Sequence, residues 1–406
     1  MSKKKRSDGI KPLPKWVENL CITAVALFSC IVVITGYFVY ANSVDWTVLR
    51  VIKYLILALM FLKILVFDFK YYSKKVIICL ALVLICFTVS AFISDNRTLL
   101  QFFIVIVSAF RVDFKKLLKC FLVFEGGLFL LIILLAAFGV IPDLVFGRAG
   151  EFGVLRHSLG FRWCATPAIF GWSLSMAYLY YCGKEIKWWE LLAIFIINIV
   201  LYALTDTRLE FACVILGIIA SVVYKYKEKL MTGFVKETLR SLVIFLPIIL
   251  TLLSFVLACT YTPTNDVMKK LDSWSSSRLK LSNLAVNEYS LKAFGNKTEW
   301  TGLSDIYEGA ADDEDFKSVD NSYILIFLRY GLLVGIIVLM MYFVLGEWSV
   351  IRGDYLLEMM LFIIMLHSLF NPHLMTIPHN VFLLLIMPAM VHFADKPGEL
   401  INRAKK

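Results

Sequence analysis

The stretch VIICLALVLICFTVSAFIS, residues 76–94, decides the class of fold. It contains no charged residue and follows the basic residues Lys70, Lys74 and Lys75. A helix needs about 20 mostly apolar residues to cross the hydrocarbon core of a bilayer, so this stretch predicts a transmembrane helix. Similar stretches recur and predict an all-α, polytopic integral membrane protein with about 12 transmembrane helices. The candidate spans are residues 17–40, 46–67, 76–94, 98–110, 117–141, 165–182, 188–205, 208–224, 240–260, 321–346, 355–370 and 379–394.

The composition excludes the soluble classes of protein. Of 406 residues, 60% are hydrophobic and 18% are charged, whereas soluble domains are about 45–50% apolar. The net charge of +10 would suit a nucleic acid only if Lys and Arg shared one solvated face. Apolar runs separate these residues, so we expect no nucleic-acid partner. The 9 cysteines are scattered without a CxxC pair, so we expect no metal, cofactor or disulfide framework.

The distribution of Lys and Arg predicts the orientation of the chain. Short loops rich in these residues face the cytoplasm, and the N-terminal 15 residues are strongly basic. We therefore expect a multi-pass protein of the cell (plasma or inner) membrane with both termini in the cytoplasm. The predicted organisation is a cytoplasmic tail (1–16), spans one to nine (17–260) with an outer loop (142–164), a large extracytoplasmic loop (261–320), spans ten to twelve (321–394) and a cytoplasmic tail (395–406).

Charged residues gather near the predicted outer ends of the spans. Arg156 and His157 precede the sixth span, while Arg208 opens the eighth with Glu210 two residues later. Arg278 lies in the long outer loop. Ionisable groups at such positions are often functional because they are costly to place near lipid.

Each of these arginines also has a purely structural explanation. Arg156 could bind a lipid phosphate at the interface, and Arg278 could be a solvated surface residue. Arg208 could form a local pair with Asp206 or Glu210.

Other polar groups have uncertain roles from sequence alone. Glu125 and Arg329 lie within predicted spans. An unpaired charge there costs roughly 2.5 to 3.5 kcal/mol, so each side chain needs an internal partner or a water-filled cavity. The two could form an ion pair with each other. The acidic run 312–315 suits a solvated loop face or, alternatively, a divalent cation. His373 and His379 lie at the predicted outer face, where one could act as a base.

Several short motifs occur in a characteristic order along residues 140–345. The most specific is Asp320-Asn321-Ser322-Tyr323, followed by Tyr330-Gly331 at the start of a helix. The others are Arg156-His157-Ser158-Leu159-Gly160-Phe161, Thr205-Asp206-Thr207-Arg208-Leu209-Glu210, and Ser277-Arg278-Leu279 followed by Phe294-Gly295-Asn296. In this order and placement the chain resembles the O-antigen polymerase and ligase superfamily, specifically the Wzy-type repeat-unit polymerases of bacterial capsule, exopolysaccharide and O-antigen synthesis.

The resemblance implies glycosyl transfer at the outer leaflet. A growing glycan on polyprenyl pyrophosphate would move onto the next lipid-linked repeat unit, with a repeat-unit flippase and a chain-length regulator as candidate partners. Guanidinium groups suit the pyrophosphate leaving group, because they are permanently charged and donate paired hydrogen bonds. The implied substrate-binding residues are Arg156, Arg208, Arg278, Asn321 and Tyr323, and the implied candidates for the catalytic base are Asp320, Glu210 and His157, in that order.

Two departures from the family pattern bear on this prediction. Asp320 stands where the ligases commonly have His, which favours a polymerase. Ser276 and Ser277 precede Arg278, where Gly before Arg is more usual.

Two other functions stay open from the sequence. A ligase would move finished glycan to another acceptor, such as lipid A or a wall polymer. A twelve-helix transporter is the alternative from a different class, but its usual long loop lies inside, between spans six and seven, whereas this chain has its long loop outside, after span nine. A structural or partner-recruiting membrane protein would leave the outer arginines unexplained.

Overall fold

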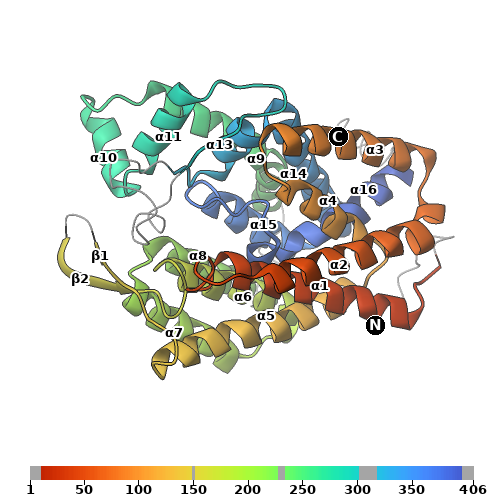
Figure 1. Cartoon of the computed structure of the whole chain (residues 1–406), viewed down its shortest axis with the longest axis horizontal. Helices are drawn as coiled ribbons and strands as arrows, with labels where there is room; N and C mark the ends of the chain where they lie inside the picture. Colours follow the sequence, from red (N-terminus) through yellow and green to blue (C-terminus); the bar gives the residue numbers. More distant parts are fainter. Residues whose placement is uncertain (1–10, 149–150, 227–233, 301–317, 396–406) are drawn as a thin grey trace.

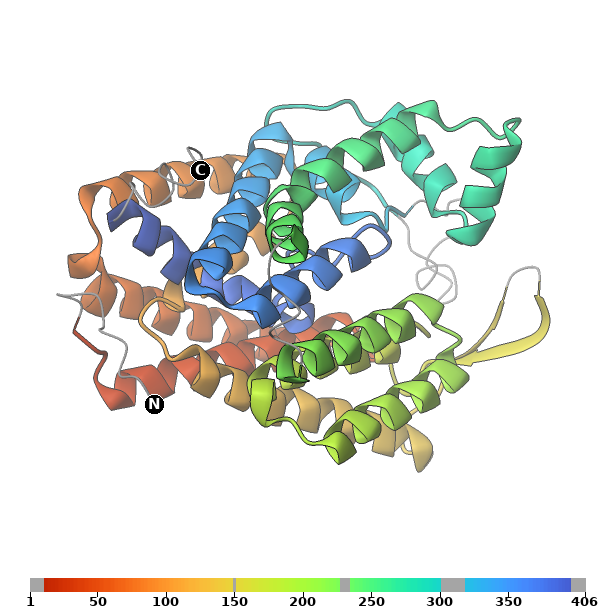
Figure 2. The ribbon, with the colours of Figure 1, turned by 180° about the vertical axis from the view of Figure 1, so that it is seen from behind.

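The computed structural model describes residues 11–148, 151–226, 234–300 and 318–395 (Figure 1). Helices dominate it, and they run back and forth between two ends of the molecule (Figure 1, Figure 2). The elements are α1 (Lys15–Gly36), α2 (Thr47–Lys63), α3 (Lys74–Ile93), α4 (Thr98–Ser108), α5 (Phe114–Ala137), β1 (Val145–Arg148), β2 (Glu151–His157), α6 (Thr166–Cys182), α7 (Trp188–Thr205), α8 (Arg208–Tyr226), α9 (Phe234–Thr260), α10 (Asp266–Trp274), α11 (Arg278–Glu288), α13 (Ser322–Leu325), α14 (Leu332–Arg352), α15 (Tyr355–His367) and α16 (Ile386–Asp395).

Many of these helices have the length and composition of membrane spans. Among the described residues, 7 helices are long and apolar enough to cross a membrane, namely α1, α3, α5, α7, α8, α9 and α14. α4, α15 and the segment Val381–Asp395 are apolar but shorter. α2 has 17 residues and continues into a π-helical turn, Ile64–Asp68. The predicted helical membrane architecture is thus confirmed at this level, and the count of about 12 spans stays a prediction.

The packing of the bundle also suits a membrane. Large apolar side chains such as Phe92 and Val123 are exposed on the outside of long helices, an arrangement that soluble proteins avoid. α15 is apolar and buried nearly all round, so it forms the centre of the bundle, against α6, α8 and α9. A polar contact also lies inside, where the Asn198 side chain donates to the Ser175 hydroxyl at 2.9 Å.

Two short strands, β1 and β2, depart from the predicted all-helical fold. They form an antiparallel hairpin with Phe146 opposite Arg156. The segment contains Gly147 and Gly153, which disfavour a helix. Strands β1 and β2 of the predicted outer loop 142–164 project from one end of the bundle, away from the start of α1 (Figure 1), whereas Phe161 and Cys164 of the same loop are buried. We call this end the hairpin end, and the opposite end, where α1 and α5 begin and α14 ends, the basic end.

The predicted tenth span, 321–346, is not one continuous helix. α13 and a π-helical turn, Ile326–Tyr330, come first, and α14 starts only after Gly331, whose φ is 93°. Residues 292–296 pack against this break, where the carbonyls of Lys292 and Ala293 accept the amides of Leu332 and Leu333 at 2.9 and 3.0 Å. The break is stable because its free amides are taken up by a distant segment.

Glu125 and Arg329 have separate partners rather than each other. The Ser29 hydroxyl of α1 donates to the Glu125 carboxylate. Arg329 donates to the Thr298 hydroxyl at 2.9 Å, and its guanidinium carbon lies 4.4 Å from the centre of the Trp300 ring. Arg329 precedes α14, so its charge is satisfied at the hairpin end and not in the middle of a span.

The predicted large loop, 261–320, contains two helices in its described part. α10 and α11 follow α9 directly and lie at the hairpin end (Figure 1). The acidic run 312–315 lies outside the described residues, and so does the divalent cation site considered for it.

Candidate functional site

Glu210 is the centre of a buried polar network at the hairpin end. Asp206, in the left-handed conformation, ends α7, and the chain turns directly into α8, which places Glu210 in its first turn. The Asn371 amide donates to Glu210 Oε1 at 3.1 Å, and His367 Nε2 lies 3.4 Å from the same oxygen. Trp172 stacks on the His367 ring at 3.8 Å between centroids. A buried carboxylate needs such partners, because an unpaired buried charge is strongly unfavourable.

The motif Asn321-Ser322-Tyr323 joins this network through its backbone and hydroxyl. The Ser322 hydroxyl donates to the Asn371 carbonyl at 2.5 Å. The Asn321 side chain accepts the amides of Tyr323 and Ile324 at the start of α13. Its amide group also donates to the Ser254 hydroxyl of α9 at 2.9 Å. The motif thus orders the segment that carries Asp320, its neighbour in sequence.

Tyr323 is buried against the central helix. Its hydroxyl donates to the Met365 carbonyl at 2.9 Å, and only 1% of the residue is exposed. The side chains of Tyr323 and Asn321 are therefore both held by the protein itself. The expectation that they bind substrate stays a prediction, and these contacts give both a structural role.

Arg278 and Asp320 form an ion pair that solvent can reach. Arg278 Nε lies 2.9 Å from Asp320 Oδ2, and the two side chains are 28% and 34% exposed. The structure thus pairs Asp320 with Arg278 and places Glu210 in the buried network at the same end of the bundle. These three residues are far apart in the sequence.

The local backbone explains how Arg278 is presented. Ser276 and Ser277 have φ values of 56° and 64°, in the left-handed region that favours glycine. This tight turn starts α11 at Arg278 and points the helix start toward Asp320. The serines therefore occupy a conformation in which a glycine would be less strained.

Arg156 and Arg208 lie around the turn between α7 and α8. Arg156 Nε donates to the Thr205 carbonyl at 2.8 Å, which ties the β hairpin to the end of α7. Arg208 Nε lies 3.8 Å from Asp206 Oδ1, with 59% of the Arg208 side chain exposed. The local pair with Asp206, one of the sequence alternatives, is present at this distance. Such an exposed pair contributes little to stability.

His157 is held apart from this group. Neighbouring residues on a strand point to opposite faces, so Arg156 faces the α7 turn while His157 faces Asp143. His157 Nδ1 lies 2.6 Å from Asp143 Oδ2, and the other carboxylate oxygen accepts the Leu159 amide at 2.7 Å. His157 thus forms a separate histidine–carboxylate pair and, within the described part of the chain, has no hydrogen bond or ion pair with Glu210 or Asp320.

His373 and His379 form an aromatic cluster beside the network. Their ring centroids are 4.2 Å apart, and His379 also contacts Tyr37 and Phe170 at 5.0 and 4.5 Å. Burial, together with the neighbouring His367, lowers the pKa of His373 to about 3, which keeps this ring neutral at pH 7. His379 is buried, whereas His373 is partly exposed but a weak base because of its low pKa, so Asp320 remains the preferred candidate.

His367, Asn371 and Trp172 are parts of the network that sequence reasoning did not select as a site. The sequence held one indication of this pair. His367 and Asn371 are four residues apart at the end of a predicted span, and in a helix this spacing places two side chains on one face. The stacking of Trp172 on His367 joins α6 to α15, and no local pattern indicates it.

The chain was compared with known proteins at the level of families, sequences and structures. No family model matches it, and neither a curated protein nor a solved structure matches it. The function proposed below therefore depends on the residues of this chain and on the motifs quoted above.

Proposed function

We propose that this protein polymerises polyprenyl-pyrophosphate-linked oligosaccharide repeat units into a surface polysaccharide, by glycosyl transfer at the outer leaflet of the cell membrane. In this proposal the hairpin end faces outward, the chain crosses the membrane about 12 times, and both termini are cytoplasmic. The observation that carries the proposal is the set of three arginines with two carboxylates at one end of a helical bundle. Arg156, Arg208 and Arg278 come from three distant segments, Asp320 pairs with Arg278, and Glu210 lies in the first turn of α8.

Arg156 and Arg208 hold the pyrophosphate of the donor. Both belong to the turn at Thr205, one through a hydrogen bond and the other through the chain, so one diphosphate can contact both. Negative charge develops on this group as the anomeric bond breaks, and preorganised donors are worth about 2.7 to 4 kcal/mol at such a position in known enzymes. No nucleotide is required, because the pyrophosphate itself is the leaving group.

Asp320 takes the proton of the acceptor hydroxyl, and Arg278 orients this carboxylate and the acceptor. Asp320 suits the role better than Glu210 because it is partly exposed, whereas Glu210 is bonded to Asn371 in the interior. The acceptor oxygen forms the new bond to the anomeric carbon, the bond from that carbon to the pyrophosphate oxygen breaks, and polyprenyl pyrophosphate leaves. By analogy with other single displacements, attack opposite the leaving group inverts the anomeric centre.

Glycan sizing in the native host tests this function. Deletion of the chain should leave lipid-linked single repeat units, which complementation with the intact chain converts to polymer. Arg208→Ala should fail to restore polymer at a normal protein level, whereas Arg97→Ala, which removes an exposed arginine before α4, should restore it. Long polymer stranded on lipid would instead indicate a ligase, and unchanged glycan would indicate a transporter or another role. Normal polymer with Arg208→Ala would refute the assignment of that residue.

A further inference from the structure

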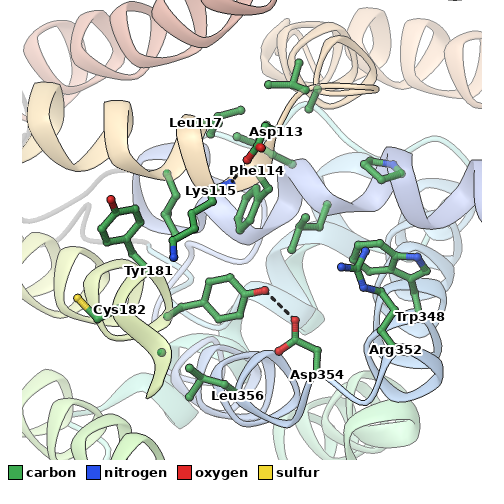
Figure 3. A pocket seen from close by; sticks show the side chains of 18 of the residues that line it. Asp113, Phe114, Lys115, Leu117, Tyr181, Cys182, Trp348, Arg352, Asp354 and Leu356 are labelled. Carbon is green, nitrogen blue, oxygen red and sulfur yellow. Dashed lines mark hydrogen bonds between the residues drawn. The ribbon is translucent and has the colours of Figure 1, made fainter. Parts of the chain in front are cut away.

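A cavity of about 600 Å3 opens at the basic end, far from the site proposed above. Its walls come from the starts of α5 and α15 and the ends of α6 and α14. Figure 3 shows Lys115 and Arg352 on different sides of it, with Asp354 near Arg352 and Tyr181 near Lys115. Ligand pockets in proteins commonly have volumes of about 300 to 1,000 Å3, so this cavity can take a small molecule or a lipid headgroup.

Three acidic residues of the described chain line the cavity, Asp113, Glu185 and Asp354, and two of them accept hydrogen bonds from the protein. The Asp113 carboxylate accepts the amides of Lys115 and Lys116 at 2.9 and 3.2 Å, which caps α5. Asp354 accepts the Leu357 amide at 3.2 Å and the Tyr180 hydroxyl at 2.8 Å, the latter drawn as a dashed line in Figure 3. Both carboxylates therefore lie at helix N-termini, where negative charge is favourable.

The basic residues of the wall are differently placed. Lys115 Nζ lies 5.4 Å from the centre of the Tyr181 ring, and the Arg352 guanidinium carbon lies 4.2 Å from that of Trp348. Neither Lys115 nor Arg352 forms an ion pair with a residue in the described part of the chain. Both side chains are exposed. The aromatic rings position these cations without neutralising them, so their charge stays available to a ligand.

The remainder of the lining is amphipathic. A third basic residue, Lys184, also lines the cavity next to Glu185 in sequence, and Leu384, Leu385 and Pro388 supply apolar surface. Basic pockets between helices at a membrane surface bind phosphate headgroups, since the apolar part of the ligand stays in the membrane while the phosphate contacts Lys and Arg. We propose that this cavity binds a phosphate-bearing anion, and that Lys115 and Arg352 contact the phosphate.

Native mass spectrometry of the full chain, purified in uncharged detergent, tests the proposal with two probes. Dioleoylphosphatidylglycerol represents a lipid source, with dioleoylphosphatidylcholine as its zwitterionic reference, and inorganic pyrophosphate represents a soluble source. Near a membrane each cation contributes about 1 kcal/mol, so Lys115→Gln and Arg352→Gln should each weaken binding about fivefold, and the double variant by more. Lys74→Gln with Lys75→Gln removes two exposed cations of the same end that do not line the cavity, and it should leave binding unchanged.

The two probes separate the sources of the phosphate. Loss of phosphatidylglycerol binding in the pocket variants but not in the control supports a lipid headgroup, and the same pattern with pyrophosphate supports a soluble phosphate. The proposal is overturned if neither probe depends on Lys115 and Arg352, or if the control variant lowers binding equally. Each single variant is measured beside the double variant, with its thermal unfolding midpoint, so that one misfolded variant does not decide the result. None of these outcomes depends on glycosyl transfer.

Discussion

At the residue scale, the pair of Arg278 and Asp320 is the most informative feature of the hairpin end. The two groups are 2.9 Å apart and each is about one third exposed, so a substrate hydroxyl can reach the carboxylate. By contrast, Glu210 is bonded to Asn371 within the protein. Substitution of Asp320 and substitution of Glu210 are therefore expected to have different effects.

Asp320→Asn keeps the shape of the side chain and removes the ability to accept a proton. Under the proposed function, lipid-linked single repeat units should accumulate while the protein inserts normally, because binding by the arginines remains. Gel sizing of the lipid-linked glycan measures this. Asp266→Asn, at an exposed position at the start of α10, serves as the control and should give normal polymer. Unchanged chain length with Asp320→Asn would remove this residue from the role of base.

Ser277→Gly should stabilise the protein. Ser277 has a φ of 64° and makes no capping hydrogen bond, and a non-glycine residue in the left-handed conformation costs about 1 to 2 kcal/mol. The thermal unfolding midpoint in detergent should therefore rise. Ser273→Gly, inside α10, should lower the midpoint, because glycine in a helix costs about 0.5 to 1 kcal/mol. A fall with Ser277→Gly would contradict the account of this turn.

At the scale of elements, the break before α14 shows how a distant segment shapes a helix. A Cβ on Gly331 would collide with the backbone of Gly295, and a Cβ on Gly295 would collide with the Arg329 carbonyl. The two glycines let residues 292–296 approach closely enough to accept the free amides of Leu332 and Leu333. The apolar run 321–346 therefore does not fold as one continuous helix, because it contains a turn that the contact with 292–296 stabilises.

Gly331→Ala should destabilise the protein by about 2 to 4 kcal/mol, because it adds left-handed strain to a backbone collision. Thermal or denaturant unfolding in detergent would show this loss. Gly127→Ala in α5 is the matched control, since no atom lies within 4 Å of its added Cβ and alanine favours a helix by about 0.8 to 1 kcal/mol over glycine. Equal effects of the two substitutions would contradict the close contact at Gly331.

At the scale of the whole molecule, the two ends differ in the chemistry that they present. The hairpin end carries the paired arginines and carboxylates, and the basic end carries the cavity with Lys115 and Arg352. Because loops rich in Lys and Arg stay in the cytoplasm, we expect the hairpin end to face outward.

Cysteine labelling tests this orientation. Asp266→Cys at the hairpin end should react with a membrane-impermeant maleimide in cells with an intact inner membrane, whereas Lys75→Cys at the basic end should react only after permeabilisation. The parent chain gives the background from its native thiols. Of these, Cys164 is buried, which raises the pKa of its thiol to about 11 and slows its reaction. The reverse labelling pattern would invert the orientation and place the proposed site on the cytoplasmic side.

The sequence by itself determined the helical membrane architecture and the candidate arginines. This was possible because a bilayer requires long apolar runs and every backbone group to be bonded within its own helix, and both requirements are local. Only the tertiary structure decided the partners, such as Thr205 for Arg156, Asn371 and His367 for Glu210, and Thr298 for Arg329. It also decided the hairpin, the break at Gly331 and the basic-end cavity. Such contacts join segments far apart in the chain, and they depend on how the helices pack rather than on the composition of any one of them.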